Sequence, residues 1–316
     1  MIIGGAEDKL RRRRILKEFV AASGGPEARI AVIPTASSLG DEIVEVYDAL
    51  FRTEGAAEVT SVRPQSREQA SDPDLVGILE KATGIFMTGG NQLKLSSIVC
   101  GTPVGDAIVE AHQRGAVVGG TSAGASIQSS HMLAFGVGGS VPKQRMTQMA
   151  AGLGLLPSTV IDQHFEQRNR YGRLLMIVSQ SPQLLGLGVD EDTAAIVQDG
   201  VLSVVGRGAV TIMDPANITT NAFDAKRSAP LLASGVILHV LPQGARFDLT
   251  SRRLLPYDVP VDALEAAEIA EAGTDLRQMA RDIAAGDASP SVLRRRLRRT
   301  RRSRPDSAAP QDGDHR

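Results

Sequence analysis

The most informative stretch of the chain is Ala-Val-Val-Gly-Gly-Thr-Ser-Ala-Gly, residues 116–124. It begins as an apolar run typical of a buried strand, and residues 120–124 then fit the pattern G-x-S-x-G. A tight strand-to-helix turn around a nucleophile needs small residues, because the backbone is strained there and neighbouring groups approach closely. The stretch therefore predicts a strand that ends at an exposed nucleophile, Ser122, with the Ala123 N–H aimed at the position of an oxyanion.

On the N-terminal side of this stretch, β-branched runs alternate with amphipathic segments. Such alternation is typical of an α/β protein, and we expect three α/β/α layers with a mainly parallel central sheet. After about residue 185 the pattern becomes richer in strands, which we assign to the far side of the same domain. The predicted strands are residues 29–34, 59–62, 84–88, 116–119, 194–197, 202–205, 210–213 and 236–241, and the predicted helices are 41–53, 75–81 and 106–114.

Composition narrows the class of protein. The chain has 316 residues, 42% hydrophobic and 22% charged, which is ordinary for a globular protein. A net charge of -1 and an aromatic content of 3% without tryptophan argue against nucleic-acid binding by base stacking. No apolar run approaches the ~20 residues that span a bilayer, and residues 1–9 do not fit a signal peptide. The single Cys100 fits a reducing compartment, so we expect a cytoplasmic location and no membrane partner.

The C-terminal part differs from the rest. We expect a catalytic domain over residues 1–260 and a helical, Arg-rich and disordered tail over residues 261–316. Residues 264–285 show helical spacing, and eight arginines lie between residues 294 and 304. Two alternatives stay open for this tail: a solvated, dispensable extension, or a contact with nucleic acid or an acidic polymer.

A serine nucleophile needs a base within hydrogen-bond reach. His164 is the best placed, because it stands at the end of a short strand among polar residues. The other four histidines fit less well: we expect His112 on a surface helix, His131 on the helix after Ser122, His239 in a core strand, and His315 in the tail.

A carboxylate is needed to orient that base. Residues 188–192 supply three acids, Asp190, Glu191 and Asp192, at the end of another apolar strand, although a solvated turn would look the same. Cys100 and the scattered histidines show no metal-ligand spacing, so we expect no metal and no cofactor.

Several segments together resemble cyanophycinases and, more distantly, dipeptidase E. They occur in the order of that peptidase family and cover about residues 2–250. These segments are residues 4–9 (GGAEDK), 33–38 (IPTASS), 88–93 (TGGNQL), 119–125 (GGTSAGA), 162–165 (DQHF) and 188–194 (GVDEDTA).

The resemblance implies a catalytic triad of Ser122, His164 and Glu191. The order Ser, His, acid is similar to class I glutamine amidotransferases, with Ser in place of Cys, which implies that fold for the domain. The oxyanion hole would comprise the N–H groups of Gly90 and Ala123. Asn91 departs from the family, where Asp is common at this place. A homodimer is also implied.

The implied substrate is cyanophycin, a polyaspartate whose side chains carry arginine through isopeptide bonds, cut to β-Asp-Arg dipeptides. Guanidinium groups would bind the free arginine α-carboxylates, and Asp162 could hold a substrate guanidinium. An alternative for the arginines is a solvated helix face. The implied substrate-binding residues are Gln92, Asp162, Gln163, Arg168, Arg170 and Arg173.

Two other functions are considered. The first is a dipeptidase E-like aspartyl dipeptidase. The second is a non-catalytic binding protein on the same fold whose Arg-rich tail engages nucleic acid. The DQHF segment with its three arginines favours cyanophycinase over the first.

Overall fold

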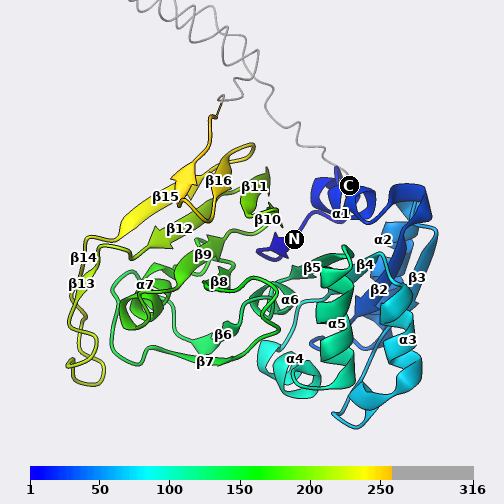
Figure 1. The fold of residues 1–316 in the computed structure, drawn as a ribbon, viewed down its shortest axis with the longest axis horizontal. Coiled ribbons are helices and arrows are strands. Elements are labelled where there is room, and N and C mark those ends of the chain that lie inside the picture. The colour runs from blue at the N-terminus through cyan, green and yellow to red at the C-terminus, as the bar shows by residue number, and fades with distance from the viewer. Residues whose placement is uncertain (258–316) are drawn as a thin grey trace, which may run out of the picture. The chain divides into compact units, whose positions relative to one another are not determined.

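A nine-stranded mixed sheet forms the centre of the computed structural model, which describes residues 1–257 (Figure 1). One half of the sheet is parallel, and the other half continues from β1 with antiparallel strands. The parallel half contains, in spatial order, β1 (Ile2–Ile3), β5 (Val117–Thr121), β4 (Gly84–Met87), β2 (Arg29–Ile33) and β3 (Glu58–Ser61). The antiparallel half adds β10 (Thr193–Gln198), β11 (Val201–Gly206), β16 (Arg246–Asp248) and β17 (Arg253–Leu254).

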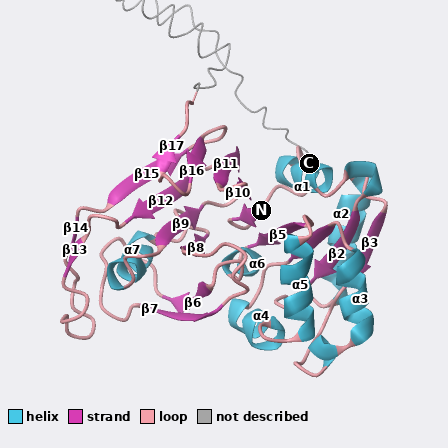
Figure 2. Cartoon of the chain, in the orientation of Figure 1, coloured by secondary structure: helices cyan, strands magenta, loops and turns pink. Residues whose placement is uncertain are grey.

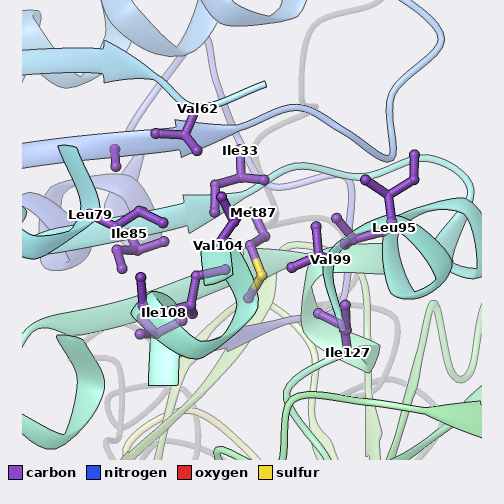
Figure 3. Packing of buried hydrophobic residues seen from close by; sticks show 14 of the residues in the cluster. Ile33, Val62, Leu79, Ile85, Met87, Leu95, Val99, Val104, Ile108 and Ile127 are labelled. Carbon is purple, nitrogen blue, oxygen red and sulfur yellow. The ribbon is translucent and has the colours of Figure 1, made fainter. Parts of the chain in front are cut away.

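Helices cover both faces of the parallel half (Figure 2). Successive residues of β2 point to opposite faces, so Ile33 packs in one core cluster and Val32 in another. The first cluster includes residues of α3, α4 and α5 (Figure 3), and the second includes residues of α1 and α2. The helices are α1 (Arg14–Ala22), α2 (Asp41–Thr53), α3 (Pro73–Lys81), α4 (Gln92–Val99), α5 (Pro103–Gln113), α6 (Ala123–Ser126) and α7 (Tyr171–Gln180), with 3-10 turns at Gly25–Glu27 and Gln69–Ser71.

The described residues also form a second, separate sheet of four strands. Its order is β15-β12-β9-β8, with β8 parallel to β9 and the other pairs antiparallel. The strands are β8 (Thr159–Gln163), β9 (Leu185–Val189), β12 (Val210–Asp214) and β15 (Ile237–Leu241). Two hairpins complete the described chain: β6 (His131–Gly136) with β7 (Thr147–Ala151), and β13 (Thr219–Thr220) with β14 (Ala233–Ser234).

The α/β class and the parallel core match the expectation, but the strand-rich part was only coarsely anticipated. β10 and β11 are joined by Asp199 and Gly200, both with positive φ, and such a two-residue turn makes a hairpin. Antiparallel strands need no crossover helix, so half of the large sheet is antiparallel. The segment from β8 onward also forms a sheet of its own.

Met1–Tyr257 form one compact unit. Residues 258–316, which contain the whole of the expected helical and Arg-rich tail (residues 261–316) and the last three residues of the expected catalytic domain, lie outside the described residues. The expectations for that tail therefore stay predictions. Within residues 1–257, no helix is long and apolar enough to cross a membrane.

Candidate active site

Ser122 lies directly after β5 in a strained turn. Its φ of 53° and ψ of -106° are rare for a residue with a side chain. The glycines on either side allow this turn, because a Cβ on Gly120 would lie 2.9 Å from the Gly124 Cα, and one on Gly124 would lie 2.7 Å from the Met87 Cβ. The G-x-S-x-G pattern is therefore required by close backbone packing between β5, α6 and β4.

His164 and Glu191 meet Ser122 from the second sheet. His164 follows β8, and Glu191 lies between β9 and β10. The His164 Nε2 is 3.1 Å from the Ser122 Oγ, and the His164 Nδ1 is 2.5 Å from a Glu191 carboxylate oxygen. With Nδ1 donating to Glu191, Nε2 is left to accept the serine proton. The Glu191 backbone N–H in turn donates to the Gln167 side chain at 2.9 Å.

The pKa of His164 is lowered from its ordinary value. Burial is the main cause, because it disfavours the charged ring, and the positive charges of Arg168 and Arg170 act in the same direction. The hydrogen bond and charge of Glu191 oppose the shift without cancelling it. His164 is thus neutral at pH 7, the state in which it can act as a base.

The loop after β4 runs beside the serine. A Cβ on Gly89 would lie 3.3 Å from the Ser122 Cβ, and Gly90 has a φ of 143°. Within residues 1–257, neither the Gly90 nor the Ala123 N–H donates a hydrogen bond to another group of the chain. Asn91 caps α4 by accepting from the Lys94 N–H at 3.0 Å, which a carboxylate would also do, so this departure from the family leaves the loop intact.

Gln92 and Gln163 are brought together at the nucleophile. The Ser122 hydroxyl is 3.4 Å from the Gln163 Oε1, and the Gln163 amide donates to the Gln92 Oε1 at 3.1 Å. The Gln92 amide donates to the Leu133 carbonyl oxygen. This chain of amides fixes both side chains beside Ser122, where they could contact a substrate.

Asp162 requires a correction. It is fully buried, and its carboxylate accepts hydrogen bonds from Arg173 at 2.6 Å and from Arg170 at 3.1 Å. The expectation that Asp162 holds a substrate guanidinium therefore does not fit, because two guanidinium groups of the chain already occupy it. The alternative of a solvated arginine face is also wrong for Arg170 and Arg173, which are buried.

Arg168, Arg170 and Arg173 place three guanidinium charges near one buried carboxylate, that of Asp162. The pKa of Arg170 is lowered to about 10, mainly by burial, and Arg170 therefore stays charged at pH 7. Arg168 is exposed, and its backbone N–H donates to the His164 carbonyl oxygen at 3.1 Å. The cluster thus has guanidinium charge in excess of what Asp162 neutralises.

The end of β1 and the residues after it bind the backbone of Ser122, of His164 and of the residue that follows Glu191, a role that sequence reasoning missed. The carbonyl oxygens of Ile3, Gly4 and Gly5 accept hydrogen bonds from the N–H groups of Ser122 (3.0 Å), His164 (2.8 Å) and Asp192 (2.8 Å), in that order. Gly5 also lies against the His164 ring, since a Cβ there would be 2.6 Å from the ring Nε2. The adjacent Gly4 and Gly5 were the feature of the sequence that could have indicated this role.

The Glu7 carboxylate binds the turn that carries Ser122 through a hydrogen bond from Thr121. The Thr121 hydroxyl donates to Glu7 at 2.6 Å, the Lys9 ammonium lies at 2.7 Å, and the Tyr47 hydroxyl also donates to it. Burial alone would raise the pKa of Glu7, but the charge of Lys9 and these hydrogen bonds outweigh burial and lower it. No spacing in the sequence pointed to this buried carboxylate.

The other histidines stay away from the site. His131 is not on the helix after Ser122, as we expected, because α6 ends at Ser126 and His131 begins β6 with its side chain exposed. His112 lies in α5, and His239 lies in β15 with its ring centroid 4.8 Å from that of Phe247. His315 is outside the described residues. Among residues 1–257, no group of three His, Cys, Asp or Glu side chains is placed to hold a metal.

The family model of peptidase family S51 matches residues 1–205. The chain belongs to peptidase family S51. The expectation of a serine peptidase is confirmed by this membership. The chain is 41% identical to the cyanophycinase of Nostoc sp. over 81% of its own length and 87% of that protein. It is also 41% identical to the cyanophycinase of Geminocystis herdmanii, over 78% of this chain and 92% of that protein.

A solved structure supports the fold. A peptidase from an acI-B1 actinobacterium superimposes with a TM-score of 0.53 and 23% identity, covering 75% of this chain and 95% of that one. At this identity the match shows the fold alone, and it agrees with an α/β peptidase domain.

Proposed function

We propose that this S51 peptidase hydrolyses the polyaspartate backbone of cyanophycin to β-Asp-Arg dipeptides. The observation that carries the proposal is the line from the Ser122 hydroxyl through the His164 ring to the Glu191 carboxylate, in a chain 41% identical to cyanophycinases. This geometry suits acyl transfer, because the serine has a base in reach and the base has a carboxylate partner.

In the first step the Ser122 oxygen attacks an aspartyl carbonyl carbon while His164 takes the hydroxyl proton. The negative charge on the carbonyl oxygen is stabilised by the N–H groups of Gly90 and Ala123. Collapse of the tetrahedral intermediate breaks the C–N bond, and His164 gives its proton to the leaving amine. Water then attacks the acyl-enzyme with His164 again as the base, which releases the carboxylic acid and the free Ser122.

The substrate assignment draws on the chemistry around Ser122. Each cyanophycin unit exposes a free arginine α-carboxylate, and a guanidinium binds a carboxylate through paired hydrogen bonds. Arg168 is exposed next to His164, and Arg170 has charge beyond what Asp162 balances. We assign these arginines to the substrate carboxylate and the amides of Gln92 and Gln163 to its backbone. Asp162 and Arg173 support that arrangement from the interior.

The test is incubation of the purified protein with insoluble cyanophycin, followed by mass spectrometry of the soluble fraction. Wild type and Ser251→Ala, a change at an exposed serine on a remote turn, should release β-Asp-Arg, and Ser122→Ala should release none. Removal of the nucleophile costs on the order of 10⁶-fold in kcat in a comparable triad. An intact polymer with wild type would overturn the substrate assignment, and cleavage of Asp-Leu instead would establish the aspartyl dipeptidase.

We also propose a finer fold assignment, an oligomeric state and a cellular location for this protein. Helices on both faces of the parallel strands, together with the order Ser, His, Glu along the chain, support a three-layer, class I glutamine amidotransferase-like domain. The resemblance to cyanophycinases supports a homodimer, and the lone Cys100 supports a cytoplasmic location.

A further inference from the structure

A strongly basic loop follows β1, a central strand of the sheet that carries the candidate site. Residues 9–14 read Lys-Leu-Arg-Arg-Arg-Arg, five basic residues in six positions. Many charged runs only form a solvated surface. This run differs because it is anchored close to the triad and its backbone is held by hydrogen bonds. Neither the triad nor the proposed chemistry uses these arginines.

The loop is tied to the triad through its first residues. The Asp8 N–H donates to the Asp192 carboxylate at 2.8 Å, and the Asp192 N–H donates to the Gly5 carbonyl oxygen at 2.8 Å. Asp192 is the residue after Glu191, and Gly5 lies against the His164 ring. The basic loop therefore begins at the rim of the site.

The loop is also rigidly folded. Both oxygens of the Asp8 carboxylate accept backbone N–H bonds, from Leu10 and Arg11 on one side and from Arg12 and Arg13 on the other, at 2.7 to 3.1 Å. These bonds hold the pKa of Asp8 well below its usual range, so it stays ionised and the turn stays formed. A fixed backbone reduces the entropy cost of binding a ligand to its side chains.

Some of these charges are already paired, and others are available. Lys9 pairs with Glu7 at 2.7 Å, and Arg13 pairs with Glu54 at 2.9 Å. Arg11, Arg12 and Arg14 are exposed and form no ion pair within residues 1–257. Leu10, which directly precedes Arg11, is 93% exposed. Two further carboxylates that contact this loop, those of Asp8 and Asp192, accept backbone N–H bonds from it.

We propose that Arg11 and Arg12 form an outer subsite that binds α-carboxylates of cyanophycin units beyond the unit being cleaved. The inference rests on the proposed function and deepens it. A polymer carries a carboxylate on every unit, so a second guanidinium pair at the rim can hold the chain while the triad acts on one bond. A substrate too short to reach the rim gains nothing from it.

The test compares one variant on two substrates. Arg11→Ser/Arg12→Ser should raise the KM for soluble cyanophycin by about fivefold at low salt, as expected for the loss of two exposed charge contacts. The kcat should stay at the wild-type value, as should both constants for a synthetic β-Asp-Arg trimer. The increase in KM should shrink at high salt, because exposed charges are screened. The matched control is Arg246→Ser/Arg253→Ser, which removes two exposed arginines from β16 and β17.

Each other outcome bears on the proposal. An unchanged KM for the polymer overturns the subsite, and so does an equal loss on polymer and trimer, or the same KM increase in the control. Salt-sensitive retention of RNA that the double variant loses, with polymer kinetics unchanged, would assign the loop to nucleic acid instead. If wild type cleaves neither substrate, the proposed function itself has failed.

Discussion

Replacement of Gly5 by alanine tests whether the segment after β1 positions the base. A Cβ at this position would lie 2.6 Å from the His164 Nε2, whereas non-bonded carbon atoms rest at about 3.5 to 4.0 Å. The imidazole must therefore retreat by roughly 1 Å. A displacement of that size can cost about 100-fold in rate, because proton transfer from Ser122 needs a short, aligned contact.

Backbone strain must be separated from this displacement. Gly5 has a φ of 106°, which alanine adopts at a cost of more than about 1 kcal/mol. Gly55 provides the control, since its φ is 100° and a Cβ there would meet nothing within 4 Å. Gly55→Ala should lose a similar amount of stability and retain full activity.

The assay is kcat on a β-Asp-Arg trimer, together with urea unfolding of both variants. We expect Gly5→Ala to lose about 100-fold in kcat. If Gly5→Ala keeps the wild-type kcat while it is destabilised no more than Gly55→Ala, the packing argument is refuted. Loss of activity in both variants would point to global strain instead of displacement of His164.

Three further outcomes are expected. Asp162→Asn should lower the free energy of unfolding by about 3 to 5 kcal/mol in urea titrations, because two buried guanidiniums lose their carboxylate; a loss below 1 kcal/mol, as expected for Asp48→Asn in a partly exposed ion pair, would contradict this. The acid limb of kcat/KM should lie below pH ~6.5, because burial lowers the pKa of His164 and activity appears as the ring loses its proton. Glu191→Gln should move that limb to still lower pH, since Glu191 raises the His164 pKa, and should reduce kcat on the order of 10⁴-fold by disturbing the tautomer; an acid limb that moves to higher pH would contradict the assignment.

The sequence predicted those features that depend on neighbours in the chain. The turn at Ser122 could be anticipated because its glycines act locally. The expected helix through His131 failed because a four-residue helix ends at Ser126 and a hairpin follows. The burial of Asp162 could also not be predicted from the sequence, because a run of arginines has the same pattern whether it is solvated or packed against a buried carboxylate.

Contacts between distant residues could not be derived from spacing. Glu7 bonds to Thr121 across 114 positions, and no local pattern marks one buried carboxylate among the other acids. The choice of Glu191 among three adjacent acids came from the resemblance, because alternation along a turn does not say which side chain reaches the His164 ring. The structure brings Glu191 there through Gln167 and the packing of β9 against β8.

The position of β1 has a consequence for synthesis of the protein. Ile2 pairs with Gly120 on one side and with Ala195 on the other, and both partners are synthesised much later than Ile2. β1 must therefore wait for a neighbour nearly two hundred residues later in the chain. Since β1 also leads into the loop that holds His164, a nascent chain cannot assemble a working site until β10 has emerged. Cleavage activity is thereby postponed until most of the fold exists.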